Sequence, residues 1–230
     1  MTDLHTHILP GMDDGAKTEE DALALLRLQQ KQGVDTVALT PHFDRQNEEI
    51  PEFLARRESA WAQLSNKTAG QNFPKMILGA EVCWMSGIAQ WPDLEKLCYQ
   101  GTRILLVELP FRPWNDETFH QLYSLENCRG LLPMIAHVDR YLPFQNKAHL
   151  EQLLEMGYPI QVSADALFYT HGRKRVLDFL QNNDAVLISD CHNLTKRKPN
   201  MGDGLKIVEK KLGSDFAHRI AELSDEILTF

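Results

Sequence analysis

The first residues of this sequence that could do chemistry are two histidines and two aspartates near its N-terminus. His5 and His7 are two positions apart, so both imidazoles point to the same side if this segment is a β-strand. Two imidazoles on one side can bind one divalent metal ion. Asp13 and Asp14 follow on a loop in which one proline and two glycines favour tight turns. A polar strand followed by a turn would contain the same residues, so this segment alone does not establish a metal site.

Residues of the same ligand types recur along the chain, at the ends of apolar segments. Glu81 and Glu108 are the most informative, because a carboxylate within an apolar strand is unfavourable unless it is paired or bound to a metal ion. A hydrogen bond to a loop amide, or an ion pair with an arginine, would account for either residue alone. Their joint occurrence favours a metal centre. Its candidate ligands are His5, His7, Asp14, His42, Glu81, Glu108, His137, Asp190 and His192.

Seven apolar segments predict strands that would position these residues, and amphipathic segments between them predict helices. The strands are expected over residues 1–5, 34–40, 76–82, 103–109, 131–136, 159–163 and 185–189. The helices are expected over residues 18–33, 48–67, 115–127, 148–156, 173–181, 204–212 and 215–227. This alternation predicts a parallel α/β fold, either an open sheet or a closed barrel. A barrel is favoured, because the candidate ligands follow nearly every strand and barrel strands end at one mouth.

Composition narrows the class of protein. The 230 residues are 43% hydrophobic, and no linker or low-complexity segment interrupts them, which predicts a single domain over residues 1–230. The net charge of -8 argues against nucleic-acid binding but permits an anionic substrate, because bound metal ions invert the local field. Four cysteines without a close pair are typical of a reducing cytosol. No signal-like or membrane-length segment occurs, so we expect a cytoplasmic protein without membrane insertion.

Several motifs carry a resemblance to a known family. They are D-L-H-T-H-I-L-P-G-M-D-D-G-A, T-P-H, G-A-E, E-L-P, I-A-H-V-D-R and S-D-C-H-N-L-T-K-R-K-P. Together they resemble the polymerase-and-histidinol-phosphatase (PHP) superfamily. The resemblance is greatest to its manganese-dependent tyrosine-protein phosphatase branch, from bacterial capsule and exopolysaccharide operons. It extends from the first strand to Pro199 and implies a distorted (β/α)7 barrel that holds three metal ions.

The resemblance also implies how the ligands are shared among the ions. One ion would be bound by His5, His7, Glu81 and Asp190. A second would be bound by Glu81 as a bridge, Glu108 and His137. The third would be bound by Asp14, His42 and His192. The sequence departs from the family at Val138 and Asp139, where Pro-Glu is usual, but neither residue is an expected ligand.

This ligand set indicates phosphate chemistry. Four carboxylates and three divalent ions leave a formal charge of about +2, which suits a phosphate monoester dianion. Arg140 and Arg197 are expected to bind the phosphate, although Arg140 could instead pair with Asp139 or another acid. Water activated by the ions would attack phosphorus in line, with Asp190 orienting it and either His42 or a metal-bound water protonating the leaving group. Mixed oxygen and nitrogen ligands suit Mn²⁺, which the family favours, and also iron or zinc.

The sequence also permits three other interpretations. Cys191 and Arg197 have the C-x5-R spacing of cysteine-based tyrosine phosphatases, but no glycine lies between them to form a phosphate-binding loop. A buried cysteine without a catalytic role is therefore expected. An enzyme with the same metal centre could instead hydrolyse a small phosphate monoester, such as histidinol phosphate or a sugar phosphate, or a nucleic-acid end. The protein could also be a metal-binding regulatory module without activity, whose barrel only binds a partner such as a tyrosine-rich kinase tail. The favoured hypothesis is a hydrolase of phosphotyrosyl protein, acting on the tyrosine-rich tail of a bacterial tyrosine kinase.

Overall fold

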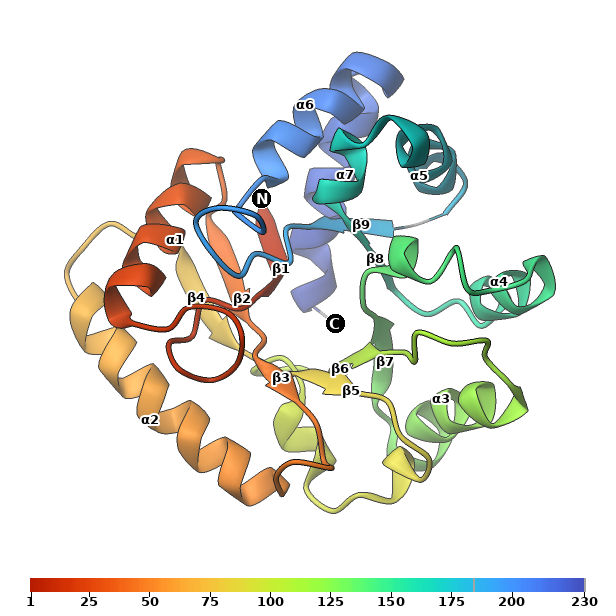
Figure 1. Ribbon diagram of the computed structural model, residues 1–230, viewed down its shortest axis with the longest axis horizontal. Coiled ribbons are helices and arrows are strands. Elements are labelled where there is room, and N and C mark those ends of the chain that lie inside the picture. The colour runs from red at the N-terminus through yellow and green to blue at the C-terminus, as the bar shows by residue number, and fades with distance from the viewer. Residues whose placement is uncertain (184, 230) are drawn as a thin grey trace.

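Nine strands form the centre of the computed structural model, which describes residues 1–183 and 185–229. They are β1 (Thr2–Thr6), β2 (Thr36–Leu39), β3 (His42–Phe43), β4 (Lys75–Leu78), β5 (Glu81–Cys83), β6 (Ile104–Glu108), β7 (Leu132–Ile135), β8 (Ile160–Ser163) and β9 (Ala185–Ile188). All neighbouring pairs are parallel. One sheet has the order β1-β2-β4 and the other has the order β3-β5-β6-β7-β8-β9. Figure 1 shows these strands around a common centre, with helices outside them.

The strand that the sequence predicts over 76–82 is divided in the structure into β4 and β5. The strand predicted over 34–40 is found as β2, and a short strand that was not predicted, β3, follows it. Pro41 has no N–H group to donate to a neighbouring strand, and its carbonyl accepts a hydrogen bond from the Glu81 N–H at 3.0 Å. Each break moves the chain from the three-stranded sheet to the six-stranded sheet. The prediction of one continuous strand is wrong over 76–82 and is confirmed over 34–40, and the two breaks place His42 and Glu81 at the start of β3 and β5.

The first and last strands lie side by side. Thr6 and Cys191 form a parallel β-bridge. The His7 N–H donates to the Cys191 carbonyl at 2.9 Å, and the Asp190 N–H donates to the His5 carbonyl at 3.0 Å. Because β2 and β3 share one position and β4 and β5 share another, the described strands occupy seven positions around the ring. The prediction of a distorted (β/α)7 barrel is confirmed.

A buried carboxylate holds this junction together. Asp3 in β1 is fully buried and accepts hydrogen bonds from the Ser189 backbone N–H at 3.1 Å and from Gln29 Nε2 at 2.6 Å. Gln29 lies in helix α1 (Glu19–Lys31). A buried carboxylate is unfavourable without such donors, so these bonds connect β1, the end of β9 and α1. Asp3 lies two residues before His5, and Ser189 lies one residue before Asp190.

The helices mostly follow the sequence prediction. Besides α1 they are α2 (Ile50–Thr68), α3 (Asp116–Arg129), α4 (Lys147–Glu155), α5 (Thr170–Asn182), α6 (Met201–Leu212) and α7 (Ser214–Glu226). Helix α1 begins with the capping box that Thr18 and Asp21 predict. The described residues also contain five short 3-10 helices that were not predicted, namely η1 (Ile88–Gln90), η2 (Leu94–Leu97), η3 (Val138–Arg140), η4 (Ala164–Phe168) and η5 (Ile227–Thr229). Of these, η3 follows β7 and carries Arg140.

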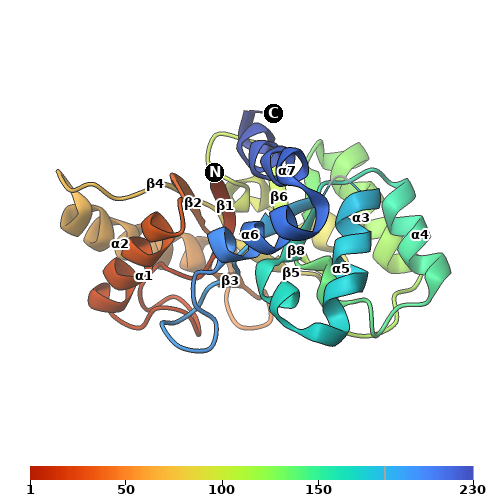
Figure 2. The same ribbon diagram turned by 90° about the horizontal axis from the view of Figure 1, so that it is seen from above.

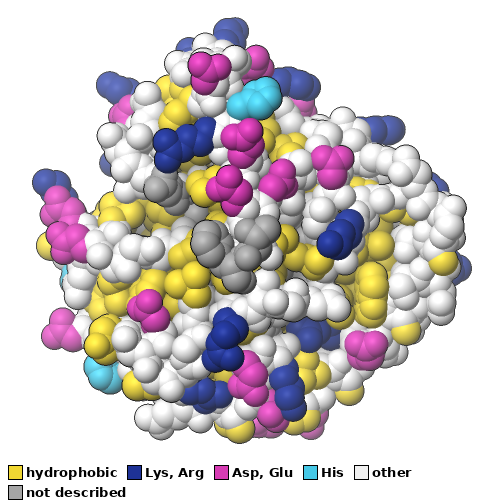
Figure 3. Space-filling model, turned by 180° about the vertical axis from the view of Figure 1, so that it is seen from behind, with side chains coloured by type: hydrophobic (Ala, Val, Ile, Leu, Met, Phe, Trp, Pro, Cys, Tyr) yellow, Lys and Arg dark blue, Asp and Glu magenta, His cyan; other side chains and the backbone are white. Residues whose placement is uncertain are grey.

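Helix α7 covers the end of the barrel at which the strands begin. Thr2 donates through Oγ1 to Asp225 Oδ1 at 2.7 Å, and the Ser224 hydroxyl accepts from the Thr2 N–H at 3.3 Å. Figure 2 shows α7 and the N-terminus on one side and the loops that follow the strands on the other. On the face seen from behind, basic and acidic side chains are interspersed (Figure 3). No helix in the described part of the chain is long and apolar enough to span a bilayer.

Candidate metal centre

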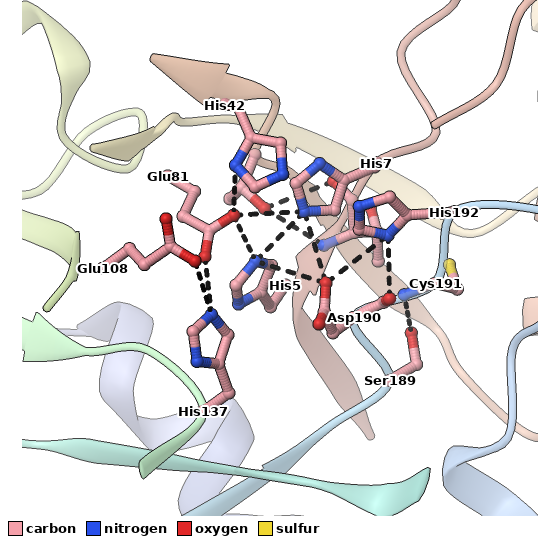
Figure 4. Close-up of polar contacts among 12 residues, drawn as sticks. His5, His7, His42, Glu81, Glu108, His137, Ser189, Asp190, Cys191 and His192 are labelled. Atoms are coloured by element: carbon pink, nitrogen blue, oxygen red, sulfur yellow. Dashed lines mark hydrogen bonds and ion pairs between the residues drawn. The ribbon is translucent and has the colours of Figure 1, made fainter. Parts of the chain in front are cut away.

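The side chains predicted as metal ligands come together at the C-terminal ends of the strands. They come from β1, β3, β5 and β6 and from the segments that follow β1, β7 and β9, and Figure 4 labels all of them except Asp14. At most 1% of the surface is exposed for His5, His7, Glu81, His137, Asp190 and His192. The side chains nearer to solvent are Glu108, His42 and Asp14, which are 19%, 36% and 65% exposed. The cluster therefore has a buried base and an open rim.

Glu81 lies at the middle of the cluster. Its Oε2 atom is 3.1 Å from His5 Nε2, 3.3 Å from His7 Nε2 and 2.8 Å from His42 Nδ1. Its other oxygen, Oε1, is 2.8 Å from His137 Nε2. Burial disfavours the charged carboxylate, but the charge of His5 and the hydrogen bond with His137 outweigh it and hold the pKa of Glu81 well below its usual range. Glu81 is thus an ionised carboxylate with one oxygen on each side of the cluster.

The first two predicted ligand groups are close together in space. Asp190 Oδ1 is 3.3 Å from His7 Nε2 and 3.7 Å from His5 Nε2, which places it with Glu81 around the two imidazoles. On the other side of Glu81, His137 Nε2 is 3.4 Å from Glu108 Oε1. Both groups therefore share Glu81, as a bridging ligand requires.

The third predicted group lies towards the rim and has one additional member. Asp14 Oδ1 is 3.5 Å from His42 Nε2 and 3.2 Å from His192 Nε2. The His7 ring also belongs to this group, because its centroid is 3.7 Å from that of His192. His42 in turn forms a group with Glu81 and Glu108. His7 and His42 therefore each belong to two groups of ligand atoms, whereas the sequence prediction assigned each histidine to one ion.

Several polar atoms in the buried part of the cluster have no hydrogen-bond partner. Among the described residues they include Glu81 Oε2, Asp190 Oδ1 and His192 Nε2. Buried polar atoms are normally paired, and those left unpaired need an explanation. Imidazole nitrogen and carboxylate oxygen are the ligands that divalent transition-metal ions take in proteins. The donor set and its unpaired atoms fit bound metal ions.

Two residues that orient the histidines were missed as functional residues by the sequence interpretation. Asp13 Oδ2 is 2.7 Å from His7 Nδ1 and also accepts from the His42 backbone N–H at 2.9 Å. Gln161 Oε1, in β8, is 2.8 Å from His5 Nδ1. These contacts turn the Nε2 atoms of His5 and His7 towards Glu81, as outer partners of metal-binding histidines do. The sequence feature that could have indicated a role for Gln161 is its polar amide within an apolar strand.

Both predicted phosphate-binding arginines contact the cluster. Arg197 Nη2 is 2.6 Å from Asp190 Oδ2, and Arg140 Nη2 contacts the same oxygen. Their side chains are 34% and 33% exposed, so each guanidinium also reaches solvent. Asp139, the alternative partner for Arg140, instead accepts a hydrogen bond from the Ser163 backbone N–H at 2.8 Å. The arginines therefore lie between the buried ligands and the open mouth.

Comparison with known proteins identifies the family. The sequence model described as "Capsular polysaccharide synthesis, CpsB/CapC" matches residues 1–228. This chain belongs to the CpsB/CapC family. It is 31% identical to the tyrosine-protein phosphatase YwqE of Bacillus subtilis, over 99% of this chain and 91% of that protein. It is 30% identical to the tyrosine-protein phosphatase CpsB of Streptococcus pneumoniae, over 96% of this chain and 94% of that protein.

A solved structure of this family has the same fold. Its report covers YwqE of Bacillus subtilis and CpsB of Streptococcus pneumoniae and describes them as unique metal-dependent tyrosine phosphatases. The TM-score is 0.85 at 27% sequence identity, over 100% of this chain and 94% of that one. The CpsB/CapC fold therefore extends over the whole barrel.

In this CpsB/CapC member, Cys191 is not placed for catalysis. Its thiol is fully buried, 3.4 Å from Gln29 Nε2, and burial raises its pKa far above the usual value for cysteine. Figure 4 shows its sulfur directed away from the ligand cluster. The amides that follow it do not form a phosphate cradle, because Asn193 Oδ1 accepts from the N–H groups of Thr195, Lys196 and Arg197. The expectation of a buried cysteine without a catalytic role agrees with this geometry.

Proposed function

We propose that this chain is a metal-dependent protein-tyrosine phosphatase that binds three divalent ions, with Mn²⁺ as the preferred metal. The observation that carries the proposal is the convergence of nine imidazoles and carboxylates, among which Glu81 Oε2, Asp190 Oδ1 and His192 Nε2 are buried without a hydrogen-bond partner. The names of the curated relatives support the choice of phosphotyrosine, and the description of the solved relatives supports the metal dependence. The phosphatase unit extends over residues 1–230.

The ions would be held by three overlapping groups of ligands. The groups are His5, His7, Glu81 and Asp190; then Glu81, Glu108 and His137; and then Asp14, His42 and His192. Four carboxylates and three divalent ions leave a formal charge of about +2, which attracts a phosphate monoester dianion. When bound, such ions supply an activated water molecule and stabilise the negative charge that develops on phosphate oxygens.

The residues at the rim would bind the substrate and move the proton. Arg140 and Arg197 each have further N–H groups besides those on Asp190, and these can donate to phosphate oxygens. Asp190 lies between both arginines and the histidines, where its carboxylate can orient the attacking water. His42 is the most exposed imidazole of the cluster and is positioned to give a proton to the leaving oxygen. A tyrosyl leaving group, with a pKa near ~10, needs less protonation than an alkoxide.

The substrate would be a phosphotyrosyl protein in the cytoplasm. The family description places its members in capsular polysaccharide synthesis. We infer that the partner is the tyrosine-rich tail of a bacterial tyrosine kinase, since the curated relatives are named tyrosine-protein phosphatases. Dephosphorylation of such a tail would regulate capsule or exopolysaccharide synthesis. Neither nucleic-acid binding nor membrane insertion is required.

The test combines a substrate panel with metal analysis. Protein purified without chelator should contain bound metal and hydrolyse a phosphotyrosyl peptide faster than the matching phosphoseryl peptide, histidinol phosphate or a sugar phosphate. His192→Ala should lose metal and most of its turnover, whereas the control His120→Ala changes an exposed residue of α3 and should lose neither. Faster turnover of a small phosphate would favour the alternative substrate class. Full turnover and full metal content in His192→Ala would contradict the proposal.

A further inference from the structure

Two half-exposed phenylalanines lie beside the ligand cluster. Phe111 follows β6 and Phe144 follows η3, and they are 45% and 46% exposed. Their rings meet edge to face, with centroids 6.2 Å apart. The Phe111 ring also stacks on the His137 ring, with centroids 5.9 Å apart and an angle of 17° between the planes. His137 is only 1% exposed, so Phe111 lies between this predicted ligand and solvent.

The two segments that carry these rings are fixed to each other. Gln145, next to Phe144, accepts from the Trp114 N–H at 3.0 Å and donates from Nε2 to the Arg112 carbonyl at 2.8 Å. In the same way, the hydroxyl of Tyr141 accepts from the Leu109 N–H at 2.8 Å. All three bonds cross from the segment after β6 to the segment after β7. The aromatic pair is therefore held in place before any ligand binds.

Exposure alone would not single out this pair. Other large apolar side chains of the described chain are also exposed, among them Tyr123 and Tyr169, and isolated cases are common on protein surfaces. Phe111 and Phe144 differ because they contact each other and because one of them stacks on a residue of the metal centre. His137 and Arg140, which we assign to metal and to phosphate, lie in the same turn as this stacked contact. An apolar wall therefore adjoins the proposed phosphate position.

We propose that Phe111 and Phe144 form the subsite for the phenyl ring of the substrate, so that this wall gives the enzyme its preference for aryl over alkyl phosphates. The inference rests on the proposed function and adds the side chains that recognise tyrosine. The phosphate on Arg140 and Arg197 would leave the ring of the same residue next to the wall. Aromatic rings attract each other through offset or edge contacts at centroid distances of about 4.5–7 Å. A seryl or sugar phosphate has no ring to place there.

Binding of two non-hydrolysable phosphonates tests this subsite. Phenylphosphonate and methylphosphonate share the charged group and differ in the ring, and their Kd values are measured by calorimetry on the Mn²⁺-loaded protein. The parent should bind the phenyl compound more tightly. Phe111→Ala and Phe144→Ala should each reduce this preference by about three- to tenfold, the range measured for aromatic contacts. Neither variant should change methylphosphonate affinity or metal content.

Matched variants separate a ring subsite from general packing. Phe111→Tyr keeps the ring and should keep the preference, and Tyr123→Ala removes an exposed aromatic side chain of α3 and should leave it unchanged. An unchanged preference in both alanine variants would overturn the inference. So would an equal loss for both phosphonates, which would mean that the rings only pack over His137. A loss confined to protein substrates would identify a docking surface instead. A parent that shows the ring preference but hydrolyses no phosphotyrosyl peptide would refute the proposed function and leave the ring subsite in place.

Discussion

Arg197 and Arg140 contact the same carboxylate oxygen of Asp190, which makes the phosphate-binding role of each one testable. Arg197→Ala should lower kcat/KM for a phosphotyrosyl peptide, because a charge-assisted hydrogen bond to phosphate is lost. The loss corresponds to about 1.5–3 kcal/mol of transition-state stabilisation. Metal content should remain that of the parent. Lys196→Ala is the matched control, since it removes an adjacent exposed positive charge. If metal is lost together with activity, Arg197 supports the ligand cluster and does not bind phosphate.

The buried thiol of Cys191 gives a second test at this scale. Because burial raises its pKa, iodoacetamide at pH 8 should modify the exposed Cys128 and leave Cys191 and turnover intact. Cys191→Ser should likewise retain most of its turnover, with a stability cost of about 1–3 kcal/mol if the new hydroxyl is unpaired. Peptide mass mapping locates the modified thiol. Inactivation that follows alkylation of Cys191 would restore the cysteine mechanism.

The residue types were informative for the ligands and less so for their partners. Histidines and acids at the ends of apolar segments could be recognised, since few other roles suit a carboxylate such as Glu108 in that position. Asp13 and Gln161 could not be assigned in the same way, because their role depends on which imidazole nitrogen faces them. That orientation is set by packing across the barrel and is not visible in the order of residues.

Among the elements, the junction of β1 with the end of β9 depends on the buried carboxylate of Asp3. Asp3→Ala should lower the free energy of unfolding by about 1–3 kcal/mol, the cost of leaving a buried donor unpaired. Urea unfolding followed by circular dichroism measures this change. Asp35→Ala is the control, because Asp35 is 83% exposed and its ion pair with the N-terminus contributes little. Equal stability of the two variants would show that Asp3 does not hold the strands together.

Element type could be predicted from periodicity, whereas strand continuity could not. Residues 76–82 are mostly apolar, so local preference favours one strand. The break after Leu78 arises because the chain must pass from one sheet to the other, and the neighbouring chain segment passes between the sheets at the same level, near Pro41. The early starts of α5 and α6 are boundary differences of the kind that capping and packing decide.

For the molecule as a whole, the convergent ligands predict that metal binding stabilises the fold. Ions that bind only the folded barrel add about 2.7 kcal/mol per site at a hundred times Kd, or roughly 5–10 °C in Tm for a chain of this size. Chelator should therefore lower Tm and abolish turnover, and added Mn²⁺ should restore both. The rise in Tm on adding Mn²⁺ should be smaller for His192→Ala than for the control variant His120→Ala. A Tm that is independent of chelator, with metal loss confirmed by elemental analysis, would refute a metal-stabilised centre.

The pairing of the first strand with the last also constrains how this protein is made in the cell. Asp3 and Ser189 are 186 positions apart, so they can meet only after most of the chain has left the ribosome. Until then β1 can pair with β2 but has a free edge on its other side. Contacts between such distant residues slow folding, because a long loop must close before they form. His5 and His7 can therefore join the other candidate ligands only after Asp190 and His192 have left the ribosome, and a nascent chain that lacks these residues should not be an active phosphatase.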